Sequence, residues 1–158
     1  MHDITILAVG RIKSSAIQFL CETYVKRLAP FARVRVVEVR AESFTTDAEK
    51  KKSKKKEGER VCAIAEKEEK RGASIFLLDE RGKEMTSYEF SEFLEKHSST
   101  PMVFIIGGAL GFSEELYSKN YEHIALSRFT FPHEFARVFL FEQLYRGITL
   151  AKGKTYHY

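Results

Sequence analysis

The sequence is poor in the residues that define specialised structural classes. Its 158 residues hold two cysteines, three prolines and nine glycines. Two cysteines are too few for a disulfide scaffold, and a composition of 44% hydrophobic and 30% charged residues excludes collagen-like, mucin-like and wholly disordered chains. No apolar run approaches the roughly 20 residues that a membrane span needs. The sequence therefore predicts a globular protein with no membrane partner.

The N-terminal segment MHDITILAVGRIK has no basic region before its apolar stretch, so it does not look like a signal peptide. A cytoplasmic location is the resulting expectation. Cys21 and Cys62 fall in helix-like apolar patterns and are expected to be buried free thiols. Because domains average roughly 150 residues, the length predicts one domain over residues 1–158.

The charge balance is mildly basic. Lysine and arginine number 26 against 22 aspartate and glutamate, which gives a net charge of +4 and suggests a polyanionic partner without establishing one. The densest charge runs from Lys50 to Lys56, where six of seven residues are lysine. Two interpretations stay open for this run: a solvated helix face, or contact with phosphates, which lysine binds without sequence specificity.

Short β-branched apolar runs alternate with helical patterns along the chain. The runs predict strands at residues 4–9, 34–39, 75–78, 103–106 and 123–126. Helices are expected between Ser14 and Pro30, from about residue 45 to 71, and at 87–96, 113–117 and 132–151. Such alternation predicts an α/β fold with a mostly parallel sheet and helices on both faces.

Two local features interrupt this pattern. Gly58 is expected to break the long charged helix, whose lysine-rich first half has little to bury and is expected to be mobile or frayed. The sequence Asp79-Glu80-Arg81-Gly82 directly after the third strand predicts a turn.

The motif Gly107-Gly108-x-x-Gly111 follows the fourth strand and precedes a helix. Its spacing is not that of a dinucleotide-binding fingerprint. It is consistent with a plain tight turn, or with a loop whose backbone approaches a ligand at the carboxyl end of the sheet.

The five histidines are scattered, and none has metal-ligand spacing with the cysteines or carboxylates, so no metal site is predicted. His133 differs from the others because it follows Pro132 at an expected helix start, and it is a candidate functional residue.

The last helix is apolar on more than one face. Its apolar residues are Phe135, Val138, Phe139, Leu140, Phe141, Leu144, Tyr145 and Ile148. A helix of this kind must be covered on several sides. A subunit interface would provide this cover, with Phe139 and Leu144 as its test positions. A central position within one subunit is the alternative.

Several motifs occur in order along the whole chain. They are an N-terminal ITILAVG strand, Leu77-Leu78-Asp79-x-x-Gly82-Lys83, Phe104-Ile105-Ile106-Gly107-Gly108-x-x-Gly111, Leu126-Ser127, Thr130-Phe131-Pro132-His133, Arg137-Val138-x-Leu140-x-Glu142-Gln143-Leu144-Tyr145-Arg146 and a terminal Tyr156-His157. In this combination the sequence resembles the RlmH-type ribosomal RNA large-subunit methyltransferases of the SPOUT superfamily.

The resemblance implies an α/β fold with a trefoil knot in its C-terminal half, a rare exception to the usual topology rules. It also implies a homodimer. The implied activity is transfer of a methyl group from S-adenosyl-L-methionine to N3 of a pseudouridine in 23S rRNA, within the assembled ribosome.

The resemblance further implies a cofactor site. Its residues would be Leu78, Gly107, Leu126, Ser127, Arg128, Phe129, Thr130 and Phe131. For catalysis, His133 and His157 are candidates to take the N3 proton, and Arg137 could hold rRNA phosphate or stabilise the N3 anion.

Other functions compete with this one. A SPOUT methyltransferase could act on another RNA such as tRNA, although residues 130–145 and the terminal Tyr-His argue against it. A non-enzymatic RNA-binding module using the lysine run would bind RNA in a salt-sensitive way but have no affinity for S-adenosyl-L-methionine. A dehydrogenase is disfavoured by the glycine spacing.

Overall fold

A computed structural model describes residues 1–153. Its five strands are β1 (His2–Val9), β2 (Ala32–Val39), β3 (Ser74–Glu84), β4 (Met102–Ile106) and β5 (Glu122–Ala125). All neighbouring strands pair in parallel, in the order β2-β1-β4-β3-β5. The α/β fold predicted from the alternating pattern is therefore confirmed, with strand ends that differ by up to two residues except in β3.

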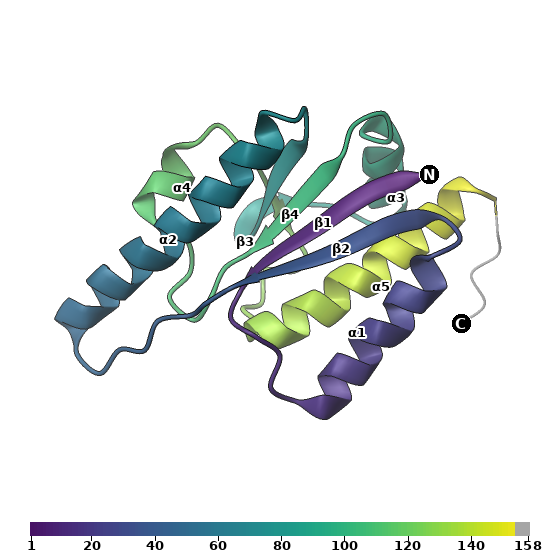
Figure 1. The fold of residues 1–158 in the computed structure, drawn as a ribbon. Helices are drawn as coiled ribbons and strands as arrows, with labels where there is room; N and C mark the ends of the chain where they lie inside the picture. The colour runs from purple at the N-terminus through teal and green to yellow at the C-terminus, as the bar shows by residue number, and fades with distance from the viewer. Residues whose placement is uncertain (154–158) are drawn as a thin grey trace.

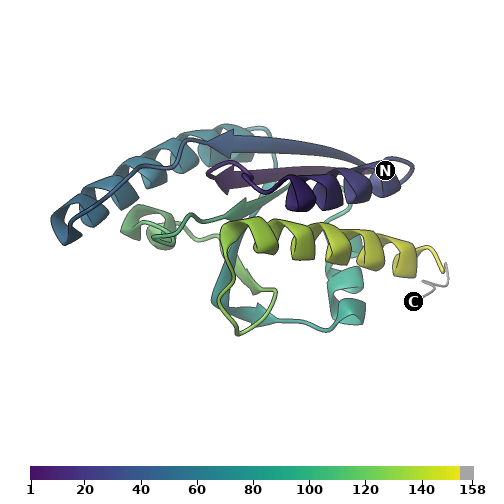
Figure 2. The same cartoon turned by 90° about the horizontal axis from the view of Figure 1, so that it is seen from below.

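Helices cover both faces of the sheet (Figures 1 and 2). They are α1 (Ser15–Leu28), α2 (Asp47–Glu69), α3 (Ser87–Lys96), α4 (Glu114–Ser118) and α5 (His133–Ala151). On one face α1, α3 and α5 pack around Phe76, Phe104 and Leu140, and on the other α2 and α4 pack around Leu77 and Ile105. The central strands β1 and β4 and the first half of β3 are buried on both sides, which explains their nearly continuous apolar runs, whereas the edge strand β2 is largely exposed.

Strand β3 is longer than predicted, because residues 79–82 do not end it. The pairing with β5 shifts between Leu78 and Lys83, since both of these residues pair with Ile124. The residues between them form a bulge in which an Asp79 oxygen accepts a hydrogen bond from the Arg81 N–H at 2.9 Å. The turn chemistry is present, but the chain then resumes the same strand direction.

Helix α2 is continuous, so the predicted interruption at Gly58 and the fraying of the lysine-rich half were wrong. Thr46 begins the helix with a capping box shared with Glu49. Gly58 lies inside the helix because α2 crosses closely over the start of α4. A Cβ atom on Gly58 would lie 2.1 Å from the Ser113 Oγ.

Helix α5 supplies both core and surface. Leu140, Leu144 and Ile148 are fully buried within the chain, whereas Phe135 and Phe139 are 49% and 42% exposed. Leu144 therefore belongs to the core of one chain and does not test a subunit interface, contrary to the expectation from the sequence.

Cys21 and Cys62 are buried free thiols, as predicted, and burial raises the pKa of Cys62 to about 11. Within residues 1–153, no helix is long and apolar enough to cross a membrane.

The crossing of α2 over α4 generates a prediction for Gly58→Ala. In the middle of an exposed helix, replacing glycine by alanine raises the free energy of unfolding by about 0.5–1 kcal/mol. Here the added methyl group meets Ser113, so we expect a loss of about 1–3 kcal/mol in the free energy of unfolding. Urea denaturation measures it. The double variant Gly58→Ala/Ser113→Gly should recover most of the loss, and a stabilised single variant would contradict the crossing.

Candidate active site

A cavity of about 890 Å³ lies at the bulge of β3 and the ends of β4 and β5. Leu78 just before the bulge, Ile106 at the end of β4 and Leu126 just after β5 form part of its wall. The loop of residues 107–112 and the loop of residues 127–132 line the rest of its rim. Ligands of open parallel sheets bind at this end of the strands, and the volume suits a small molecule or cofactor.

The loop after β4 brings its backbone to the cavity. A Cβ atom on Gly107 would lie 3.3 Å from the Phe112 ring, and one on Gly108 would lie 2.9 Å from Val9 Cγ1. Gly111 has a φ of +67° and forms a bridge with Gly108. Side chains are thus excluded from the tight part of the loop, and the glycine motif has a packing role as well as a place in the cavity wall.

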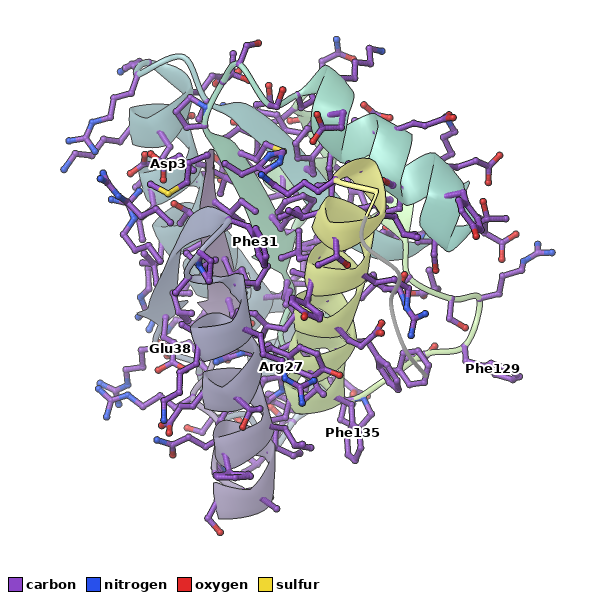
Figure 3. The ribbon with its side chains drawn as sticks, turned by 90° about the vertical axis from the view of Figure 1, so that its right-hand side faces the viewer. Asp3, Arg27, Phe31, Glu38, Phe129 and Phe135 are labelled. Atoms are coloured by element: carbon purple, nitrogen blue, oxygen red, sulfur yellow. The ribbon has the colours of Figure 1, made fainter. Side chains whose placement is uncertain are left out.

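The loop after β5 carries most of the residues predicted to bind the cofactor. The Ser127 Oγ accepts a hydrogen bond from the Phe129 N–H at 3.0 Å, which folds the loop locally. Phe131 packs on Phe139 of α5, with ring centroids 4.8 Å apart. Phe129 is 79% exposed and extends from the edge of the molecule (Figure 3).

The structure brings nearly all of the predicted cofactor residues to one cavity. Lining it are Leu78, Gly107, Leu126, Ser127, Phe129, Thr130 and Phe131. Arg128 lies in the same loop but is not among the lining residues. These positions lie up to 53 residues apart in the sequence, from Leu78 to Phe131, and the arrangement of strand ends explains why they meet.

Among the catalytic candidates, His133 lines the cavity at the first turn of α5. Its Nε2 atom is buried without a hydrogen-bond partner among the described residues, and it would lie 3.2 Å from a Cβ atom on Gly10. His133 therefore contributes to the cavity wall, while its Nε2 atom is enclosed beside Gly10.

Arg137 does not reach the cavity within one chain. It is 1% exposed, and its guanidinium donates to the Glu38 carboxylate and to the Gly10 carbonyl. In this chain the geometry gives Arg137 a structural role and does not place it against RNA phosphate or a reacting base. His157 lies outside the described residues.

A buried carboxylate beside the cavity was not identified from the sequence. Asp79 accepts hydrogen bonds from the Arg81 backbone and guanidinium, and from the Tyr117 hydroxyl at 2.7 Å. The ring of His123 stacks on Tyr117, and its Nδ1 lies 3.8 Å from Asp79. The local signal was the Asp-x-Arg sequence after an apolar strand, but Tyr117 joins only through the tertiary fold.

These contacts change the acidity of the groups involved. Burial opposes ionisation of Asp79, but the hydrogen bonds from Arg81 and Tyr117 outweigh it and lower the pKa of Asp79. Burial, with the bond to Asp79, raises the pKa of Tyr117 to about 12. Asp79 is therefore ionised at neutral pH and holds Arg81 and Tyr117 at the cavity wall.

On the opposite side of the cavity wall, Glu57 of α2 is 4% exposed. One carboxylate oxygen accepts a hydrogen bond from the Glu42 N–H at 2.8 Å. The other is buried without a partner among the described residues and would lie 3.3 Å from a Cβ atom on Gly108. Burial raises the pKa of this carboxyl group.

The architecture is that of an α/β protein with a cofactor-sized cavity bounded by a bulge in one parallel strand and the loops after two others. Comparison with known proteins gives its class. A family model described as "Predicted SPOUT methyltransferase" matches residues 2–157. The chain belongs to the SPOUT methyltransferase family.

Curated relatives match over their full length. A protein named "Ribosomal RNA large subunit methyltransferase H" from Pelotomaculum thermopropionicum is 39% identical, covering 100% of both chains. Proteins of the same name from Carboxydothermus hydrogenoformans and Kosmotoga olearia are 37% and 36% identical. Each match covers at least 98% of this chain and 99% of the relative's length. The resemblance inferred from the motifs is confirmed.

The Asp79 contacts lead to a prediction for Asp79→Asn. Because the pKa of Asp79 is lower in the folded state, its stabilising contribution is present above the unfolded-state pKa of about 3.9 and is lost as the pH falls through the folded-state value. We expect the variant to lose about 1–3 kcal/mol in the free energy of unfolding at pH 7.

Denaturant unfolding from pH 7 to pH 3 measures this effect, and the difference from wild type should shrink at the acidic end. The matched control is Glu80→Gln, an exposed neighbour that also lines the cavity, which should stay within about 0.5 kcal/mol. Equal effects of the two substitutions would contradict the assigned role of Asp79.

Proposed function

We propose that the protein transfers a methyl group from S-adenosyl-L-methionine to N3 of a pseudouridine in 23S rRNA, within the assembled ribosome. The observation that carries the proposal is the single cavity that gathers the motif residues at the β3 bulge and after β4 and β5. Support also comes from the full-length relatives named as large-subunit ribosomal RNA methyltransferases. A substrate in the ribosome implies a cytoplasmic location.

The cavity suits S-adenosyl-L-methionine. Leu78, Leu126 and Phe131 give apolar walls for a planar base, and the backbone around Gly107 gives polar groups that fix its orientation. Glu80 and Glu114 also line the cavity, and their negative charges complement a sulfonium and an amino group. When bound, this cofactor supplies an electrophilic methyl group.

The residues of the chain then have two tasks. The first is positioning, since a displacement reaction depends on the alignment of donor and acceptor. The loops of residues 107–112 and 127–132 carry out this task. The second is removal of the N3 proton. We assign it to His133, the histidine that lines the cavity; its imidazole would take the N3 proton while the methyl group passes from sulfur to N3 and the cofactor leaves as a neutral thioether. His157 remains a second candidate.

We also propose that the protein is a homodimer. Four large apolar side chains remain exposed on the adjacent helices α1 and α5: Phe19, Leu20, Phe135 and Phe139. A second copy of the chain would cover them. The trefoil knot of the C-terminal half stays an expectation from the family.

The reaction is tested by incubating the protein with isotopically labelled S-adenosyl-L-methionine and either 70S ribosomes, free 23S rRNA or bulk tRNA, and mapping the product by mass spectrometry. We expect one methyl group on a pseudouridine of 23S rRNA in the ribosome sample. Methylation of tRNA instead would indicate a different RNA target. Salt-sensitive RNA binding without any cofactor affinity would indicate the non-enzymatic RNA-binding module.

The close packing at Gly107 leads to a prediction for cofactor affinity. Gly107→Val places a branched side chain against the Phe112 ring, where the cofactor is expected to meet the backbone. We expect binding of S-adenosyl-L-methionine to be abolished in calorimetry, with a smaller loss for Gly107→Ala. Thermal unfolding checks that both variants are folded. A folded valine variant with wild-type affinity would overturn the assignment of this loop.

The exposed face of α5 leads to a prediction for assembly. Phe139→Asp places a carboxylate in the proposed interface, where an unpaired charge is costly. We expect light scattering to show a monomer, with loss of methylation. The control is Tyr88→Asp on α3, whose side chain is 72% exposed and lies on a different helix. A dimeric Phe139→Asp variant would show that this face is not the interface.

A further inference from the structure

The lysine run of α2 is not a uniform charged surface. Three of its lysines form ion pairs within the chain: Lys50 with Asp47, Lys55 with Glu59 and Lys56 with Glu42. Lys51 and Lys52 are exposed. The six positions therefore lie in different environments, and the two interpretations of the run can be examined one residue at a time.

Lys54 is distinct because it is the member of the run that lines the cavity. It is only partly exposed. Gly58, one helical turn further along the same face of α2, is the residue that contacts Ser113 at the start of α4. This face of the helix is therefore held against the loop of residues 107–113, and Lys54 is the next residue of that face toward the helix N-terminus.

The charge of Lys54 is not neutralised by the chain. Among the described residues it has no ion pair or hydrogen bond. The other side-chain cation of the cavity wall, Arg81, is bound to the buried Asp79 carboxylate. Lys54 thus brings a positive charge without an ion pair to the cavity, while the other lysines of the run do not line it.

We infer that Lys54 binds a phosphate group of the RNA nucleotide that enters the cavity, and that it is the phosphate-binding residue of the lysine run. This inference rests on the proposed function. Lysine acts toward phosphate as a point charge and positions a nucleotide without reading its base. A phosphate contact is favoured over a contact with the cofactor carboxylate because the N-terminal half of α2 extends past the end of the sheet (Figure 1) and carries the five other lysines of the run, which suits a polyanionic chain.

The experiment compares Lys54→Gln with Lys52→Gln in the full-length protein. The two variants lose the same charge from the same helix two residues apart, on opposite sides. Equilibrium binding of 70S ribosomes is measured at several salt concentrations, together with the ribosome KM and the calorimetric affinity for S-adenosyl-L-methionine. Lys54→Arg, which keeps the charge, is the rescue variant.

We expect Lys54→Gln to weaken ribosome binding and raise KM by about tenfold, because a charge-assisted contact to phosphate is lost. The log–log salt slope should shrink by about 0.7, the value for one phosphate of a single strand. Lys52→Gln and Lys54→Arg should behave like wild type. The affinity for S-adenosyl-L-methionine should not change in any of them.

Two results would overturn the inference. One is a Lys54→Gln variant whose affinity and salt slope equal those of Lys52→Gln. The other is a loss of cofactor affinity in Lys54→Gln without a change in ribosome binding, which would assign Lys54 to the cofactor carboxylate. If either result is obtained while the wild-type protein methylates ribosomes, the proposed function still stands. A wild type that binds ribosomes without methylating them contradicts the proposed function, and the binding arm still tests Lys54.

Discussion

The buried guanidinium of Arg137 determines where α5 begins, and the cavity depends on that position. It joins α5 to the Glu38 carboxylate near the end of β2 and to the Gly10 carbonyl just after β1. Because the Arg137 guanidinium is buried, leaving it without these acceptors would be costly, so the first turns of α5 are held at the carboxyl end of the sheet. His133 lies one turn before Arg137, and the loop of residues 127–132 leads directly into it.

On the other face, close helix packing forms the opposite wall of the cavity. Gly58 allows α2 to approach Ser113, and Gly108 makes room for Val9 and for the buried Glu57 carboxylate. The loop of residues 107–112 is therefore enclosed between a strand end and a helix. The backbone of this loop is thereby fixed at the cavity wall, and such preorganisation is what a cofactor site requires.

The sequence predicted those features whose signals are local. Apolar runs marked all five strands, and the motifs marked most of the cavity wall. The errors occurred where contacts between distant residues outweigh local preference. Gly58 stays helical because Ser113, 55 residues later, lies against it. The chain does not reverse direction after Asp79 but forms a bulge, because β3 pairs with β5 both before and after this position. The pairing of Arg137 with Glu38 spans 99 residues and has no local signal.

The central claim is that the bulge of β3 and the loops after β4 and β5 form one site for the methyl donor. It is tested most directly by titrating isotopically labelled protein with S-adenosyl-L-methionine and following the assigned backbone amide signals by NMR. The account predicts that the largest shifts fall on Leu78, Gly107 and residues 126–131, with little change at Lys52 or in α1. Binding that shifts signals of the groove between α1 and β2, around Ile12 and Val36, while leaving Gly107 unchanged would contradict it.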